Sequence, residues 1–423
     1  MSQTAPQAAH PAPAPATPAA PATQADPASV DTPALLNRWQ LIGMSVAIVF
    51  GILSALVQLL GWQADGRAAA DTEQLVRVQE IQSSLLRADA LATNAFLVGG
   101  LENADQRADY DVAIETVLTG ITAAADAQPA DRAVLEKLAV AVNDYATAVA
   151  QARDYNRLGY PVGAEYLSGA STTLRDALDG IPTLEALAQA NTDRAEGSMN
   201  GQHPFWLLLI GVLALAALVL LNQQLARQFR RRINKGIAIA AVILLAVTLV
   251  GVVGAWIRDA SNDNLRDGDL ALAIDQADAR TAANDAKANE SLALIKRGSG
   301  ARFVADWETS AGDVEASLRR DTGDQWNAYV AAYREIRELD EGGDWDAARD
   351  KATTDGADGS SEPLDSFDTV SEQIVKTASA TVVDDLESGQ EIALGVSVLS
   401  LLLGVVAAVF VARGIGERRK EFS

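Results

Sequence analysis

Residues 236–257 read GIAIAAVILLAVTLVGVVGAWI, a run of 22 residues without an Asp, Glu, Lys or Arg. A bilayer core of ~30 Å needs roughly 17–25 residues of helix, so this run is long enough to cross a membrane. Three further apolar runs lie at residues 41–62, 205–224 and 391–412. The sequence therefore predicts an all-α protein with four transmembrane helices.

The distribution of Lys and Arg predicts how these helices are oriented. Residues 63–203 carry 21 acidic and 10 basic side chains, and residues 258–390 carry 30 and 14. Residues 225–235 and the tail at 413–423 are basic instead. Because basic residues favour the cytoplasmic side, we expect both termini in the cytoplasm of a multi-pass plasma-membrane protein and the two acidic segments outside. The basic loop contributes these side chains, which could set topology and contact anionic lipid or bind an acidic cytoplasmic protein: Arg227, Arg230, Arg231, Arg232 and Lys235.

The composition excludes several classes of chemistry. The chain has no Cys and only two His residues, which argues against disulfides, thiolate metal sites and imidazole relays. No phosphate loop, nucleophile elbow, zinc-binding helix or dinucleotide fingerprint is present. We therefore predict no enzyme activity, no catalytic residue, no metal, no cofactor and no nucleic-acid partner. Residues 1–38, rich in Ala and Pro, are predicted to form a disordered cytoplasmic tail.

The two segments between the spans, residues 63–204 and 258–390, have a helical pattern. They are rich in Ala, Leu, Glu, Asp, Arg and Gln, and apolar residues recur at helical spacing. Breaks fall near residues 99–100, 128–129 and 159–161, and again near 298, 321–323 and 341–343. Three breaks give four helices, so each segment is predicted to be an extracytoplasmic up-down-up-down four-helix bundle.

The two halves of the chain resemble each other. The stretch VNDYATAVAQARDYNRLG from Val142 aligns with QWNAYVAAYREIRELDEGG from Gln325 at a constant offset, which pairs Tyr145 with Tyr329. We interpret this as a tandem duplication of a unit made of a span, an outer segment and a returning span. Polar residues matched between the halves are the candidate contacts for a ligand or partner, although ordinary structural roles are an alternative: Asn94, Asn289, Arg153 and Arg337.

Small residues recur at helical spacing within two of the spans. They let helices approach closely, and we expect them to pack spans one and four against other helices. Generic use of Gly and Ala is the alternative. The residues are Gly43, Ala47, Gly51 and Ala55 in the first span and Ser400, Gly404 and Ala408 in the fourth.

The span layout and the stretch LLRADALATNAFLVGGLENADQRADYDVAI at residues 85–114 are similar to the actinobacterial GlnX membrane proteins. These are four-span proteins with two extracytoplasmic helical domains, encoded with a solute-binding lipoprotein and a Ser/Thr kinase of the protein kinase G type. The resemblance implies a transducer of aspartate or glutamate status, with the lipoprotein, the kinase and membrane lipids as partners. It leaves the oligomeric state open.

Two other functions stay open on the sequence. One is a structural envelope scaffold or adaptor that binds other envelope proteins. The other is an accessory transport subunit, which is disfavoured because the spans carry no ionisable residue near their centres.

Overall fold

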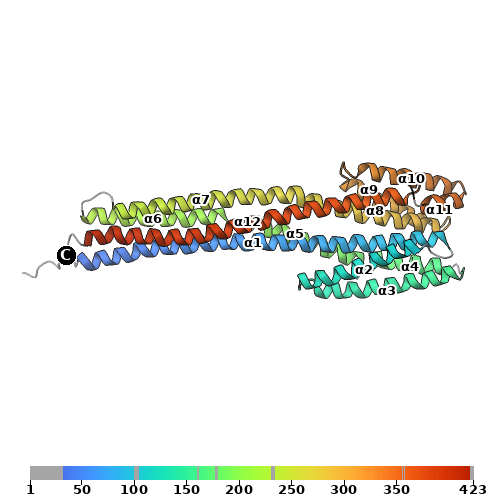
Figure 1. Cartoon of the computed structure of the whole chain (residues 1–423), viewed down its shortest axis with the longest axis horizontal. Coiled ribbons are helices and arrows are strands. Elements are labelled where there is room, and N and C mark those ends of the chain that lie inside the picture. The colour runs from blue at the N-terminus through green and yellow to red at the C-terminus, as the bar shows by residue number, and fades with distance from the viewer. Residues whose placement is uncertain are drawn as a thin grey trace, which may run out of the picture.

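A computed structural model describes residues 32–99, 104–159, 162–176, 180–229, 234–354, 356 and 358–419. Over these residues the chain is all-α, in a long rod in which every helix runs close to the long axis (Figure 1). One end of the rod consists of long helices alone, and the other is thickened by shorter helices. Four helices are long and apolar enough to cross a membrane, as predicted.

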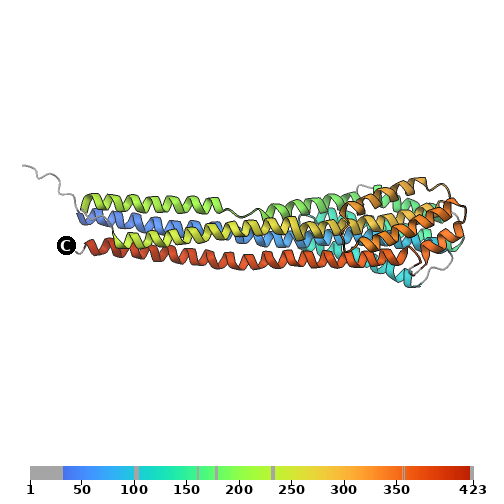
Figure 2. The same ribbon diagram turned by 90° about the horizontal axis from the view of Figure 1, so that it is seen from above.

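Three of these helices continue without a break from a candidate span into the thick end. They are α1 (Thr32–Val98), α12 (Ser361–Arg419) and a third made of α7 (Lys235–Leu265), η1 (Arg266–Leu270) and α8 (Ala271–Ile295). The remaining candidate span, the second along the chain, does not continue in this way. Here α5 (Ile181–Met199) and α6 (Pro204–Phe229) are separated by the non-helical residues 200–203. Figure 2 shows this gap as a thin connection near the middle of the rod.

Element η1 is a single π-helical turn inside the third long helix. Wider turns of this kind are rare and occur often at functional sites. It begins nine residues beyond residue 257, the predicted end of the third span, and leads directly into α8. The long helix made of α7, η1 and α8 is thus continuous but locally deformed.

The shorter helices lie on opposite flanks of the long ones (Figure 1). The first inter-span segment (residues 63–204) adds α2 (Ala104–Ala127), α3 (Arg132–Arg157) and α4 (Val162–Asp176) on one flank. The second inter-span segment (residues 258–390) adds α9 (Ala301–Ser317), α10 (Gly323–Glu341) and α11 (Trp345–Thr353) on the other.

Over its described residues, each inter-span segment therefore has five helices rather than the predicted four. All six predicted breaks fall between helices, but the first segment breaks again between α4 and α5 and the second between α11 and α12. Pro182, in the first turn of α5, is the sequence signal that was missed, because proline starts helices readily and continues them poorly.

Apolar burial divides the rod into separate cores. One core lies within the first inter-span segment and another within the second, the latter around Trp326, Tyr329 and Phe367. A third core joins α1, α5, α7 to α8 and α12 just beyond the spans. A fourth lies among the candidate spans themselves. The two segments are thus packed individually but share the core nearest the spans.

The boundaries differ in detail from those expected. Helix α1 begins at Thr32, so residues 32–38 are helical and do not belong to a disordered tail. Residues 1–31 lie outside the described part of the chain. Helices α6 and α7 extend into the predicted basic loop, to Phe229 and from Lys235, because that loop continues the helical pattern of the spans.

Candidate functional site

The two inter-span segments contact each other through buried ion pairs. Arg175 of α4 donates to Asp89 of α1 and, from Nε, to Asp285 of α8, both at 2.6 Å. Asp89 is fully buried and also accepts hydrogen bonds from Tyr145 and Ser171. Burial opposes the charge of Arg175, but Asp285 and Asp89 outweigh it and raise the pKa of the guanidinium. This arginine therefore stays charged and links the two segments.

A second set of ion pairs repeats this arrangement from the other side. Arg280 of α8 donates from Nε to Asp368 of α12 at 2.7 Å and from Nη1 to Glu80 of α1 at 2.5 Å. Arg87 of α1 pairs with Asp368 and with Asp365. Breaking a buried ion pair leaves an uncompensated charge, so these contacts hold α1, α8 and α12 in one register.

The two predicted asparagines occupy different surroundings. Asn289 of α8 donates to Asp285 at 3.0 Å and so helps to position the partner of Arg175. Asn94 of α1 is 8% exposed and lines a cavity of about 60 Å³ together with Gln106, Asn284 and other polar residues. Among the described residues, no hydrogen bond joins the two asparagines.

The two predicted arginines also differ. The guanidinium of Arg153 on α3 stacks over the ring of Tyr110, 4.1 Å from its centroid. Arg337 on α10 pairs with Asp340 and Glu341 of its own helix. Contact of either residue with a ligand or partner stays a prediction.

A buried polar cluster lies where the spans meet the inter-span segments; we call it the junction cluster. Asp65 of α1 is fully buried and accepts from Gln202, from Arg258 Nε and from Asn262 Nδ2, at 3.1–3.2 Å. Arg258 also donates to Asp385 of α12 at 2.9 Å. The cluster therefore ties together α1, the 200–203 connection, α7 and α12, which are the four paths between the inter-span segments and the spans.

Small residues lie at the contact between the first and fourth spans. A Cβ on Gly51 would lie 3.0 Å from Gly404 Cα, which is closer than most side chains approach a backbone atom. Gly404 also faces Ala47, and Gly43 faces Leu221 and Val411. Ser397 donates to the carbonyl of Ala55, Ser400 bonds the side chain of Gln58, and Ala408 is buried. Helices α1 and α12 thus approach closely along the spans.

A polar contact also joins two helix ends at the end of the rod that carries the basic residues. Asn234 caps α7 by accepting from Gly236 N and donates to the carbonyl of Gly414 in α12, at 2.8 Å. Arg227 lies in the last turn of α6 and Lys235 begins α7. Arg230, Arg231 and Arg232 lie outside the described residues. The cap fixes the start of the third span against the end of the fourth.

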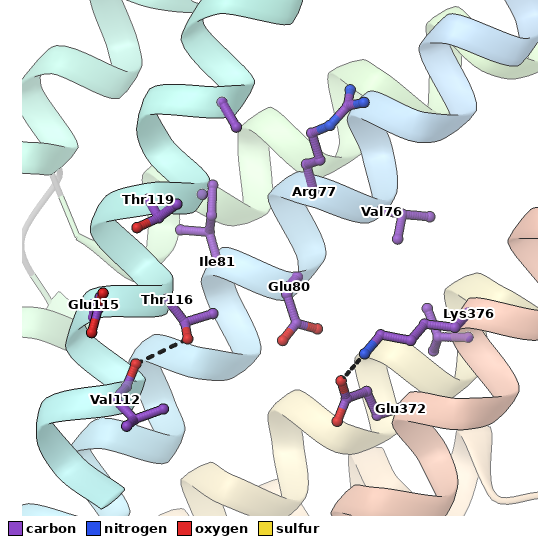
Figure 3. Close-up of a pocket in the computed structure, with 13 residues that line it drawn as sticks. Val76, Arg77, Glu80, Ile81, Val112, Glu115, Thr116, Thr119, Glu372 and Lys376 are labelled. Carbon is purple, nitrogen blue, oxygen red and sulfur yellow. Dashed lines mark hydrogen bonds and ion pairs between the residues drawn. The ribbon is translucent and has the colours of Figure 1, made fainter. Parts of the chain in front are cut away.

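An open groove of about 490 Å³ runs along the first inter-span segment (Figure 3). Its floor is α1, one wall is α2 and the other wall is α12. Apolar atoms dominate its lining, with Ile81 at the base and Val112 at the edge, and charged residues lie around it. We call it the α2–α12 groove. A similar groove of about 660 Å³ lies between α3 and α4 and includes Val140.

Acidic side chains crowd the contact between α5 and α8. Burial, and then the nearby Glu185, raise the pKa of Asp278 to about 6. Burial, and then Asp285 and Asp313, raise the pKa of Glu185 as well. Like charges therefore oppose each other across the two segments, in contrast to the ion pairs of Arg175 and Arg280.

Part of the chain matches a known protein family. Residues 64–200 match the model of the actinobacterial sensor domain, which covers the first inter-span segment. A search of curated proteins and a search of solved structures each gave no match. The matched segment contains the α2–α12 groove floor, Asp89 and Arg175. Together with the four candidate membrane helices, this match fits a GlnX-type actinobacterial sensor membrane protein.

Proposed function

We propose that this chain is a transmembrane signal transducer that relays extracytoplasmic nutrient status to a separate cytoplasmic Ser/Thr kinase. The proposed signal is aspartate or glutamate, carried by a solute-binding lipoprotein. The proposed receiver is a kinase of the protein kinase G type. Both termini and the 225–235 loop would face the cytoplasm and contact anionic lipid, in keeping with the positive charge there.

The observation that carries the proposal is the continuity of α1 and α12. Each passes from a candidate span into the inter-span segments without a break, over 67 and 59 residues. At 1.5 Å per residue, α1 extends roughly 100 Å. A stiff helix of this length carries an axial shift from one end to the other, and shifts of ~1–2 Å are typical of helical switches.

The junction cluster supports the same proposal. Asp65 and Arg258 lie where every path from the inter-span segments meets a candidate span. Their hydrogen bonds join α1 to α7 and α12, so movement of one helix changes the bonding of the others. Because residues 200–203 are not helical, the second span is not rigidly joined to α5. The arrangement thus supports a signal in which α1 moves relative to the long helices of the third and fourth spans.

The direct test is a strain from which the gene has been deleted. External aspartate or glutamate is varied, and phosphorylation of the kinase substrate is measured in the deleted strain and in one complemented with the intact gene. We expect a response only in the complemented strain. Equal responses in both strains would contradict the transducer and leave a scaffold as the better description.

A further inference from the structure

Exposed apolar side chains are distributed unequally between the two inter-span segments. Among the described residues, the strongly exposed large apolar side chains outside the spans all belong to the first segment, and the second has none. They include Val112, which is 60% exposed, and Val140, which is 62% exposed. Apolar surface retained on one segment only is typical of an interaction site.

The α2–α12 groove adds charge to this apolar surface. Three carboxylates line it, from Glu80 on α1, Glu115 on α2 and Glu372 on α12. Lys376 in the groove pairs with Glu372, whereas Arg77 pairs with Glu73, and Glu115 has no ion pair with another described residue. Arg77 and Lys376 also line the groove, so among the described residues its free negative charge is that of Glu115. The groove is therefore apolar with one unpaired carboxylate at its edge, and it is complementary to an apolar group flanked by a cation.

The floor of this groove is connected to the contacts between the segments. Glu80 receives Arg280 at 2.5 Å, and the same arginine holds Asp368 of α12. Arg280 also lies 3.7 Å from Glu372. A cation that enters the groove would compete with Arg280 for Glu80 and Glu372, and so would change the pairing of α1 with α8 and α12.

We propose that the α2–α12 groove is the docking site for a separate extracytoplasmic protein, which inserts an apolar side chain flanked by Arg or Lys. Charge complementarity carries the choice of partner, because Glu115 is unpaired among the described residues of the groove and residues 63–203 carry an excess of acidic side chains. The site rests on the proposed function in that its partner delivers the signal. Its floor, α1, and one of its walls, α12, run on into candidate spans.

The test uses the full chain in living cells. A photo-cross-linking amino acid replaces Val112 at the groove, and in a matched control it replaces Val140, an equally exposed valine on α3. The cross-linked peptides are then identified by mass spectrometry. We expect Val112 to capture a basic, apolar stretch of another extracytoplasmic protein and Val140 to capture it at least about tenfold less. A Glu115→Lys substitution should reduce the yield at Val112 by a similar factor.

Other results would overturn the proposal. They are capture at Val112 of lipid, of a second copy of this chain or of no protein, and equal capture of the same protein at both positions. The kinase response is measured in the same cells. Specific capture at Val112 without any kinase response would uphold the docking site and refute the proposed signalling, whereas an intact response without capture would do the reverse.

Discussion

Arg175 of the first inter-span segment donates to Asp285 of the second at 2.6 Å, and the same guanidinium holds the buried carboxylate of Asp89. One side chain therefore joins α4, α1 and α8. Arg280 joins α8, α1 and α12 in the same way, so these ion pairs hold α1 against α8 above the candidate spans. A signal that changes these ion pairs would move α1 relative to α8, and both helices continue into candidate spans.

Loss of Arg175 should destabilise the protein strongly. The Arg175→Met variant leaves Asp89, which is fully buried, with only neutral partners. Removing one member of a buried pair costs about 3–5 kcal/mol. We expect a loss of this size in unfolding of the detergent-solubilised protein. The control is Arg107→Met, which removes an exposed pair with Asp111 within one helix and should cost less than about 0.5 kcal/mol.

Asp65 should couple the inter-span segments to the spans. In Asp65→Asn the negative charge that receives Arg258, Gln202 and Asn262 is lost. We expect faster hydrogen exchange at residues 199–203 and loss of the kinase response. Asp385→Asn removes the more exposed partner of Arg258 and should have a weaker effect on both measurements. Equal effects of the two variants would show that the buried carboxylate has no special role.

A larger side chain in place of Gly404 should separate the first and fourth spans. A Cβ there would lie 2.7 Å from Gly51 Cα, so Gly404→Val must push α12 away from α1. Overpacking of this kind costs about 1–3 kcal/mol. Gly395 is on the same helix with nothing within 4 Å of an added Cβ, so Gly395→Val is the matched control. Resistance to unfolding in mild detergent, measured for both variants, distinguishes them.

The crowded carboxylate of Asp278 predicts a pH dependence. Burial and Glu185 raise its pKa in the folded chain from 3.8 to about 6. The folded state therefore binds this proton more tightly than the unfolded state, and stability falls as pH rises between these two values. Because Asp278 remains exposed and solvent screens its charge, Asp278→Asn should be only slightly more stable than the wild type at about pH 7 and similar to it below about pH 4. Thermal unfolding at both pH values measures this.

Asp126→Asn is the control for that experiment. Its side chain is 79% exposed, so its ionisation should contribute little. An identical gain in thermal stability at both pH values for Asp278→Asn would contradict the raised pKa of Asp278. The effect would then not depend on protonation of this carboxylate.

The spans and breaks could be predicted because they depend on local signals. Apolar runs define the spans, and Gly159, Pro129 and Gly343 mark turns whatever the surrounding fold. Gly159 and Gly343 indeed have positive φ, at 72° and 86°. The helix start at Pro182 was not predicted. A single proline in an apolar stretch also occurs at helix starts that no long break precedes.

The contacts between the segments could not be predicted. Arg175 and Asp285 are 110 residues apart, and each resembles the solvated charges found all along these helices. Arg153 and Arg337 were chosen because the halves align there, yet one stacks on Tyr110 and the other pairs within its helix. Tyr145 and Tyr329 are buried at matched positions, which favours the duplication but leaves it a hypothesis.

The central claim is that α1 must move relative to α8 for the signal to pass. Ser83 Oγ of α1 lies 2.7 Å from Thr281 Oγ1 of α8, and the chain has no native Cys. The double variant Ser83→Cys, Thr281→Cys should form a disulfide across the two segments on oxidation. The decisive measurement is the kinase response to external glutamate in cells carrying it, with each single variant as control. We predict that oxidation abolishes the response and that reduction restores it. A full response with the disulfide formed would contradict the account.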